Sequence, residues 1–555
     1  MHSTLWAGRQ RGSVAGKLLT AVLVLGLIGL GGWLLTKDSL PGGGNPLATI
    51  TGSGVPQPSE PVVGTPTLQS AAPYEMKNNI IDVDISEYAG YGGLILANGG
   101  LAPNPDSLFA KQYGFQLRLS TGESEEWSAL NAGQLAAVAT TTDVLAVLGR
   151  QFEVTVPAQI GFSRGADQVV VDSSIASINQ LKGKVLAGTQ FNESEFFIRY
   201  LASEAGVPVK VLRDLDSRPA PNELGLVFYE DAFQGCDAYA AELGGDKRLN
   251  GCVGWSPRTD QVVRDSAGAA KMLVSNRNLL VVADILVFNK GFAQAHPEVV
   301  KGLVHGLLEG NRQLREEPRA HAPVVAKAFG WSEQETLEEL SKVHLSNLPE
   351  NLAFFDGSID SAGSFQGIFQ SSVLAYGAVI RNPADPERFA DLQYLKDLQA
   401  EGLFKGQTVS IAPIRTSGKV ALEGDALLSK DIRFFFEPNS AELDNDATEN
   451  QGYLDTIRKF LQVSPGSVVL LRGHVDNAMV PEFERQGGPA LVQRMALKSM
   501  ELSRQRAQAV KAALLKRHPG IEQDRIELVG RGWEEPVSQD SEQNRRVEVQ
   551  WFTLE

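Results

Sequence analysis

The sequence predicts an α/β protein of several domains, preceded by a membrane-spanning helix. Three observations support this fold class: an uncharged apolar run at residues 18–36, alternating strand-like and helix-like patterns over residues 78–402, and a compact β-α-β-α-β pattern near the C-terminus. A chain of 555 residues is also too long for one hydrophobic core. We therefore expect separate domains joined by linkers.

The N-terminal segment indicates where the protein resides. Residues 18–36 contain no charged residue, and at ~1.5 Å per residue they are long enough to cross a hydrocarbon core of ~30 Å. Residues 1–17 carry basic but no acidic side chains, which keeps that end in the cytoplasm. A cleaved signal peptide is the alternative, but its apolar region would be shorter. We predict a cytoplasmic tail at 1–17, a single-pass anchor in the bacterial inner membrane at 18–36, and a periplasmic location for the bulk of the chain.

Two segments have linker composition. Residues 37–77 are rich in Pro, Gly, Ser and Thr and contain too few apolar residues to build a core, so we predict a flexible linker. A second linker is expected at residues 403–430. The formal net charge of -15 argues against nucleic acid as a partner, because phosphate binding needs concentrated positive charge.

The chain has only two cysteines, Cys236 and Cys252. In an oxidising periplasm they are expected to form a disulfide, with two separate buried thiols as the alternative. The histidines and cysteines lack metal-ligand spacing, and no nucleophile–base pair or phosphate-binding loop stands out. We therefore expect no metal, no cofactor and no enzymatic activity.

The middle of the chain, residues 78–402, repeats β-α units, which predicts an α/β domain with largely parallel sheets. Segments such as NAGQLAAVATTTDVLA, SRGADQVVV, INQLKGKVLAG and GCVGWSP follow one another in order. In this order they resemble the nitrate/sulfonate/thiamine-precursor branch of the ABC-transporter solute-binding proteins. The resemblance implies a type II periplasmic-binding fold, in which two α/β lobes joined by a hinge hold a solute in their cleft.

Ligands in such lobes lie beyond the C-terminal ends of strands, against helix N-termini. Residues at these places are our candidates for solute binding; some of them are equally explained as helix caps, first-turn acids or core aromatics. The candidates are Tyr88, Tyr91, Thr141, Asp143, Asp167, Asn192, Glu195, Tyr229 and Trp255.

The charge of the candidate cleft favours a cationic solute. Acidic residues predominate there, with Glu193 and Glu230 added to the candidates above, and Arg164 is the obvious cation. An acidic lining disfavours nitrate, sulfonate and phosphate, so we expect a small, positively charged or aromatic solute. The insertion that carries Cys236 and the fusion to a further domain depart from the family pattern, and both put active transport in doubt.

The C-terminal region, residues 431–555, contains GHVD, LSRQRAQAV and NRRVE in order. These motifs match the OmpA-like peptidoglycan-binding domain. Arg506 falls within the apolar arc of its predicted helix, where an arginine needs a partner, and Asp476 ends a predicted strand. Such a pair suits a zwitterion, with the carboxylate on an ammonium and the guanidinium on a carboxylate.

In the family, the matching positions hold diaminopimelate of the peptide stem. Carried over, they are Asp476 and Arg506, with Asn544 and Arg545 close to that site. An internal Asp476–Arg506 salt bridge without a ligand is the alternative. The extra segment between these two residues is unusual for the family, and we expect it to fold as an added helix over the site.

These inferences predict an inner-membrane-anchored periplasmic protein that binds peptidoglycan and a small solute. The alternative is a structural wall anchor or scaffold whose solute-binding-like domain has no ligand and recruits protein partners. An ABC permease and an envelope protein complex are further candidate partners. A flagellar-stator role is disfavoured, because residues 18–36 lack the ionisable carboxylate that proton passage requires.

Overall fold

The computed structural model describes residues 55–552, apart from gaps at 123–125, 244, 246, 360–362, 412–427 and 464–466. The predicted tail and membrane anchor, residues 1–36, lie outside the described residues, as does most of the predicted linker at 403–430. No helix within the described part of the chain is both long enough and apolar enough to span a bilayer. The anchor at residues 18–36 therefore stays a prediction.

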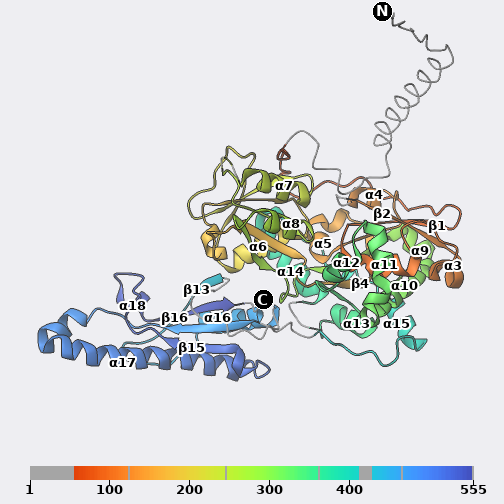
Figure 1. Cartoon of the computed structure of the whole chain (residues 1–555). Coiled ribbons are helices and arrows are strands. Elements are labelled where there is room, and N and C mark those ends of the chain that lie inside the picture. The colour runs from red at the N-terminus through yellow and green to blue at the C-terminus, as the bar shows by residue number, and fades with distance from the viewer. Residues whose placement is uncertain are drawn as a thin grey trace, which may run out of the picture. The chain divides into compact units, whose positions relative to one another are not determined.

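The first sheet forms lobe 1 (Figure 1). Its strands lie in the order β12-β4-β11-β3-β1-β2, in which β1 pairs in parallel with β2 and β3, and β11 runs antiparallel to β3 and β4. β3 and β11 are buried along their whole length, so side chains cover both of their faces. The strands are β1 (Ile80–Ile85), β2 (Gln116–Thr121), β3 (Ala137–Thr141), β4 (Val154–Ser163), β11 (Ala283–Asn289) and β12 (Val343–Leu345).

The second sheet forms lobe 2, with the order β10-β5-β9-β6-β8-β7. Here β6 pairs in parallel with β8 and β9, whereas β5 runs antiparallel to β9 and β10. The strands are β5 (Asp167–Asp172), β6 (Val185–Thr189), β7 (Val209–Val211), β8 (Leu224–Tyr229), β9 (Gly251–Trp255) and β10 (Ala270–Ser275). The prediction of two α/β lobes is confirmed.

Both sheets are mixed, and the expectation of largely parallel sheets is corrected here. The chain leaves lobe 1 after β4 and returns at β11, so the strands flanking the two crossings run antiparallel, β4 with β11 and β5 with β10. The crossing segments also bond to each other: Arg164 Nε donates to the carbonyl of Arg277 at 2.6 Å, and Asn276 Oδ1 accepts the Gly165 N–H at 2.7 Å. This pair of crossings forms a two-segment hinge.

Helices connect and cover these strands, and several begin at recognisable caps. Asn192 accepts the N–H groups of Ser194 and Glu195 at the start of α6, while Ser332 and Glu335 form a capping box at α12. The helices are α2 (Gly92–Asn98), α3 (Leu108–Tyr113), α4 (Trp127–Asn131), α5 (Thr142–Leu148), α6 (Glu193–Glu204), α7 (Ala232–Glu242), α8 (Arg258–Asp265), α9 (Lys290–Ala295), α10 (Pro297–Glu316), α11 (Pro318–Phe329), α12 (Glu333–Leu340), α13 (Leu348–Asp356), α14 (Phe365–Tyr376) and α15 (Gln393–Ala400). Short 3₁₀ helices are η2 (Ala89–Tyr91), η3 (Gly149–Gln151), η4 (Ile178–Leu181), η5 (Gly377–Val379), η6 (Pro386–Arg388) and η7 (Gln523–Arg525).

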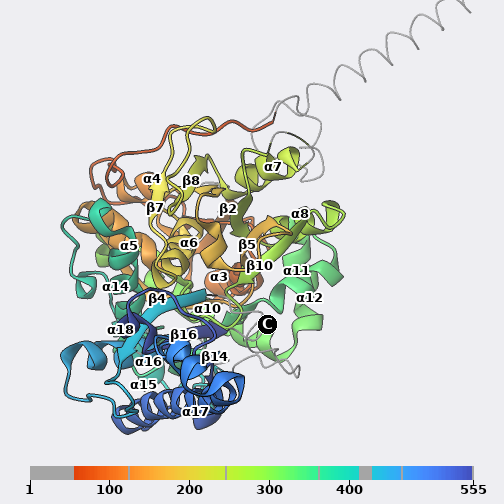
Figure 2. The same ribbon diagram turned by 90° about the vertical axis from the view of Figure 1, so that its left-hand side faces the viewer.

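Residues 55–76, here called the strap, run without helix or strand across both lobes, and Figure 2 shows them passing β8 and α4. In lobe 2, Ser59 N–H donates to the carbonyl of Phe228 at 2.8 Å, and Val62 N–H donates to Gln190 Oε1 at 2.8 Å. In lobe 1, Leu68 N–H donates to Gln151 Oε1 at 3.0 Å, and Ala72 N–H donates to the carbonyl of Asn131 at 2.9 Å.

The strap differs from the flexible linker expected at residues 37–77. Its backbone groups are paired with carbonyls and side-chain amides that lie far away in the sequence, so the composition of the segment alone does not reveal them. The strap therefore belongs to the two-lobed domain.

The C-terminal domain has a four-stranded sheet in the order β13-β16-β14-β15, with α17 packed on β14 and β15 (Figure 1). Its elements are β13 (Leu428–Phe435), α16 (Thr448–Val463), β14 (Val468–Gly473), α17 (Val480–Arg517), β15 (Ile526–Gly530), α18 (Ser541–Asn544) and β16 (Arg546–Phe552). The extra segment between Asp476 and Arg506 is helical, as expected, because it forms the first part of α17. Gly488, at φ 59° and ψ -161°, and Pro489 divide this element into two helices.

Candidate functional site

A small cavity lies where the two lobes meet. It encloses about 20 Å³, which is room for about one water-sized group. Ten residues from both lobes and the segments between them line it: Ser86, Tyr88, Tyr91, Thr141, Ser163, Asp167, Glu193, Trp255, Val282 and Asp284. Five of our candidates, Tyr88, Tyr91, Thr141, Asp167 and Trp255, are therefore brought together here.

Carboxylates from three elements reach this cavity. Asp167 begins β5, and its Oδ2 accepts the Asn276 side-chain N–H at 2.9 Å. Asp284 lies in β11, and its Oδ1 accepts the Tyr91 hydroxyl at 3.3 Å. Glu193 is the first residue of α6. The cavity is thus acidic on several sides.

Asp143 lies close to this group without lining the cavity. It is in the first turn of α5 and is wholly buried. Burial, together with the charges of Asp167 and Glu195, raises the pKa of Asp143 to about 7. Burial also raises the pKa of Asp167 and that of the Tyr88 hydroxyl. Burial therefore destabilises the charged forms of these two carboxyls.

Three candidates have other positions. Asn192 caps α6, and Glu195 pairs with Arg199 at 2.7 Å while accepting the Phe191 N–H at 2.6 Å. Tyr229, at the end of β8, lines a separate hollow of about 550 Å³ together with Arg248 and part of the strap. Asn192 and Glu195 brace α6, and none of these three candidates lines the cavity where the lobes meet.

The arginine expected near the cleft does not supply a cation to it. Arg164 is buried and its Nε bonds to the carbonyl of Arg277. Burial lowers the pKa of Arg164 to about 10. None of the ten lining residues is Lys, Arg or His.

Sequence reasoning missed Asp284, Ser163, Ser86 and Val282. Asp284 had a usable signal, since it is the only charged residue within the apolar run LVVADILVF. The remaining three follow from the paths of the crossing segments and the end of β1, which only the structure supplies.

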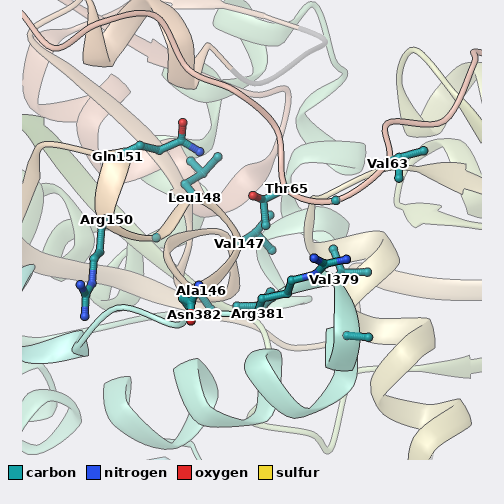
Figure 3. Close-up of a pocket in the computed structure, with 14 residues that line it drawn as sticks. Val63, Thr65, Ala146, Val147, Leu148, Arg150, Gln151, Val379, Arg381 and Asn382 are labelled. Atoms are coloured by element: carbon teal, nitrogen blue, oxygen red, sulfur yellow. The ribbon is translucent and has the colours of Figure 1, made fainter.

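A larger hollow, about 710 Å³, lies beneath the strap and is shown in Figure 3. Val63, Gly64 and Thr65 of the strap form one side, and residues 146–151 and 378–382 form the rest. Its two charged residues, Arg150 and Arg381, are both exposed. This hollow contains none of the candidate residues.

Cys236 of α7 and Cys252 of β9 form a disulfide with their Cα atoms 5.1 Å apart, so the predicted pairing is confirmed. The bond joins a helix to a central strand of lobe 2.

In the C-terminal domain, Asp476 follows the end of β14. Its Oδ1 accepts the Ala478 N–H at 3.2 Å, and Arg545 Nη1 lies 3.8 Å from its Oδ2. Both side chains are partly exposed, at 20% for Asp476 and 16% for Arg545. The structure thus pairs Asp476 with Arg545, which sequence analysis placed only near the site.

Arg506 lies behind this pair and is wholly buried. Its three nitrogens donate to main-chain carbonyls of Ser440 at 2.9 Å, His474 at 3.0 Å and Glu437 at 3.1 Å. Burial lowers its pKa to about 10, so it stays cationic at neutral pH. Arg506 fixes the loops that present Asp476, since His474 immediately precedes Val475 and Asp476.

Asn544 shapes the neighbouring loop. Its Oδ1 accepts the N–H groups of Val537 at 2.8 Å and Ser538 at 3.2 Å, and its Nδ2 donates to the carbonyl of Ser538 at 2.7 Å. It therefore holds the chain just before Arg545.

His474, Glu535 and Glu548 offer three ligand atoms within 4.8 Å of one another, the one such group among the described residues. Arg472 pairs with Glu535 at 2.7 Å and Glu548 at 3.2 Å, and Arg546 pairs with Glu548 at 2.5 Å. The arginines already neutralise these carboxylates, so the cluster is an ion-pair network more than a cation site.

Comparisons with known proteins found similar solved structures and one matching family model. One similar solved structure is the alkanesulfonate-binding protein SsuA from Xanthomonas axonopodis pv. citri bound to MOPS, with 13% identity, coverage of 53% of this chain and 96% of that chain, and a TM-score of 0.40. A second is the periplasmic aliphatic sulphonate binding protein SsuA from Escherichia coli, with 12% identity, coverage of 56% of this chain and 97% of that chain, and a TM-score of 0.43. A third is the periplasmic nitrate-binding protein NrtA from Synechocystis PCC 6803, with 11% identity, coverage of 58% of this chain and 89% of that chain, and a TM-score of 0.42. No curated protein matches the sequence. The model of the OmpA family matches residues 435–550, so this chain ends in an OmpA family domain.

Proposed function

We propose that this protein is a periplasmic receptor, anchored in the inner membrane by residues 18–36, that binds peptidoglycan with its C-terminal domain and a small solute between its two lobes. The observation that supports wall binding most directly is the partly exposed Asp476–Arg545 pair within the OmpA family domain. A carboxylate beside a guanidinium complements the ammonium and carboxylate of a zwitterion such as diaminopimelate.

The proposed roles follow from exposure. Asp476 accepts the ligand's ammonium, and Arg545 turns from its 3.8 Å contact with Asp476 to the ligand's carboxylate. Arg506 positions these groups through its three hydrogen bonds to main-chain carbonyls. Solute binding is supported by the small acidic cavity between the lobes.

Co-sedimentation of the full chain with purified peptidoglycan sacculi tests wall binding. We expect Asp476→Asn and Arg545→Ala each to abolish sedimentation with the wall. The matched control is Asp524→Asn, an exposed carboxylate of the same domain that precedes β15, whereas Asp476 follows the parallel strand β14. These two residues thus lie at opposite ends of the sheet.

The comparison between variants decides the assignment. If Asp476→Asn and Asp524→Asn both sediment with sacculi as well as the parent does, Asp476 does not bind the wall. Loss of binding in both variants would indicate a non-specific effect of charge instead.

A further inference from the structure

The interlobe cavity has an unusual balance of charge for a solute site. Asp167, Asp284 and Glu193 line it, and none of its ten lining residues carries a positive charge. Asp143 and the Glu195–Arg199 pair lie close by, and the latter is already neutral as a pair. An anion would meet three carboxyl groups and no cationic side chain here, so the lining disfavours it.

Unpartnered buried atoms point to a missing ligand. Thr141, Ser163 and Asp167 are only 1–3% exposed, and Thr141 Oγ1, Ser163 Oγ and Oδ1 of Asp167 make no hydrogen bond of ordinary geometry among the described residues. Thr141 does lie close to the Asp143 carboxyl, and Ser163 lies close to Asp167 and Tyr88. Buried polar atoms are normally bonded, and leaving one unbonded costs free energy. All three residues line the cavity, and their oxygens can accept hydrogen bonds from a donor placed in it.

The geometry favours an organic cation over a metal ion. Ligands of a divalent ion sit 2.0–2.6 Å from it, so they lie within about 5 Å of one another. In the described part of the chain, three carboxylate or imidazole ligand atoms approach within 4.8 Å only at the arginine-paired cluster of the C-terminal domain. The cavity instead has three aromatic walls, Tyr88, Tyr91 and Trp255, whose ring faces attract organic cations.

We propose that the cavity binds the primary ammonium group of a compact organic amine, an assignment that rests on the proposed solute-receptor function. The enclosed space of about 20 Å³ matches a head group the size of water, such as –NH₃⁺. Asp167 and Asp284 accept its N–H groups, Ser163 and Thr141 complete the set of acceptors, and the aromatic rings enclose the adjoining carbon. The hinge between the lobes admits the amine.

The test is calorimetric titration of the full chain in detergent with methylammonium chloride and with 1,4-diaminobutane. Sodium methanesulfonate and methanol, at matched ionic strength, serve as an anionic and a neutral probe of similar size. We expect saturable binding of the two amines only. Asp167→Asn removes a charged acceptor and is expected to weaken amine binding at least about tenfold.

Two further variants keep the test decisive. Asp284→Asn repeats the loss of an acceptor from a different strand, in case Asp167→Asn perturbs the fold. Asp84→Asn is the matched control: Asp84 is a buried carboxylate of β1 bonded to Ser120, its pKa is raised by burial to about 6, and it does not line the cavity. We expect Asp84→Asn to bind both amines like the parent.

The outcomes separate this inference from the receptor function. The ammonium site is overturned if neither amine binds. It is also overturned if Asp84→Asn weakens amine binding as much as the cavity variants do. If methanesulfonate or methanol binds instead, the receptor function stands and only the ligand class is overturned. If no probe binds and native mass spectrometry shows the chain without an adduct, both proposals are overturned and the scaffold function replaces them.

Discussion

Asp143 is wholly buried, and its carboxyl has a pKa of about 7 because burial penalises the charged form. An unfolded chain releases that proton near pH 4, so over the range between the two values the folded state binds more protons. The free energy of unfolding of the unliganded protein therefore falls as pH rises from about 4 to about 7. The pKa of Asp167 is also raised, so this residue adds to the loss of unfolding free energy.

Asp143→Asn tests this account, because the variant has no proton to lose. We expect a flatter pH dependence of the melting temperature of the unliganded protein, and a melting temperature above that of the parent at about pH 8. Asp106→Asn, which changes an exposed carboxylate, serves as the control. A parent protein that becomes more stable between about pH 5 and pH 8 would contradict the prediction.

Individual residues show how far sequence reasoning reached. Aromatic and acidic residues at or near strand ends, such as Tyr88, Asp167 and Trp255, could be located because strand ends meet at one edge of a sheet. Asn192 and Glu195 have the same sequence context, yet they cap and brace α6. A residue type and its place near a helix start do not say whether its side chain turns to the helix or to the cleft.

At the scale of elements, the strap docks on lobe 1 where Gly133 has φ +73°. A Cβ at Gly133 would lie 2.5 Å from the Pro73 carbonyl oxygen and 2.7 Å from that of Ala72. We expect Gly133→Ala to displace the strap and to increase the rate of proteolytic cleavage within residues 55–72.

Gly114→Ala is the matched control for this prediction. Gly114 has φ +75°, so alanine there carries the same left-handed strain of about 1 kcal/mol, but no atom of the described residues lies within 4 Å of the place that its Cβ would take. If both variants are cleaved equally fast, backbone strain and not loss of strap docking explains the effect.

The disulfide is a second element-scale feature, since it joins α7 to β9 across a sequence separation of 16 residues. Closing a loop of this length contributes about 3 kcal/mol in the chain-entropy model. The double variant Cys236→Ser, Cys252→Ser is expected to lose about this much unfolding free energy in denaturant titration. An unchanged unfolding midpoint would show that the bond does not constrain the unfolded chain.

Elements were predictable where the local pattern determines them. Short runs rich in Val, Ile and Leu located β1 and β14, and the extra segment before LSRQRAQAV is helical as expected. The strap was not predictable, because its partners Gln190 and Gln151 lie 128 and 83 positions away in the sequence. Composition describes how a segment behaves alone and not what it docks on.

At the scale of the whole molecule, the two proposed sites belong to different sheets. The cavity is built from the two six-stranded sheets and the wall site from the four-stranded one. We therefore expect Asp476→Asn to abolish sedimentation with sacculi while leaving methylammonium binding intact, and Asp167→Asn to do the reverse. One variant that removes both activities would show that the sites are coupled.

The C-terminal OmpA-like domain was also predictable at this scale, because its motifs lie in the region where the OmpA family model matches, residues 435–550. The direction of the strands was not, since the repeated β-α units concealed the two crossings between the lobes. Crossings are properties of the path of the chain, and the hydrogen bonds of Arg164 and Asn276 that hold them together join distant segments.

The strap also determines how the protein responds to mechanical load. Its bonds to lobe 2 at Ser59 and Val62 precede its bonds to lobe 1 at Leu68 and Ala72 along the chain. A pulling force applied upstream of Val55 therefore loads the lobe 2 bonds first and reaches lobe 1 only after they break. Bonds that are loaded one after another break one at a time. The strap therefore peels from the domain at a lower force than would be needed to break all of its bonds at once.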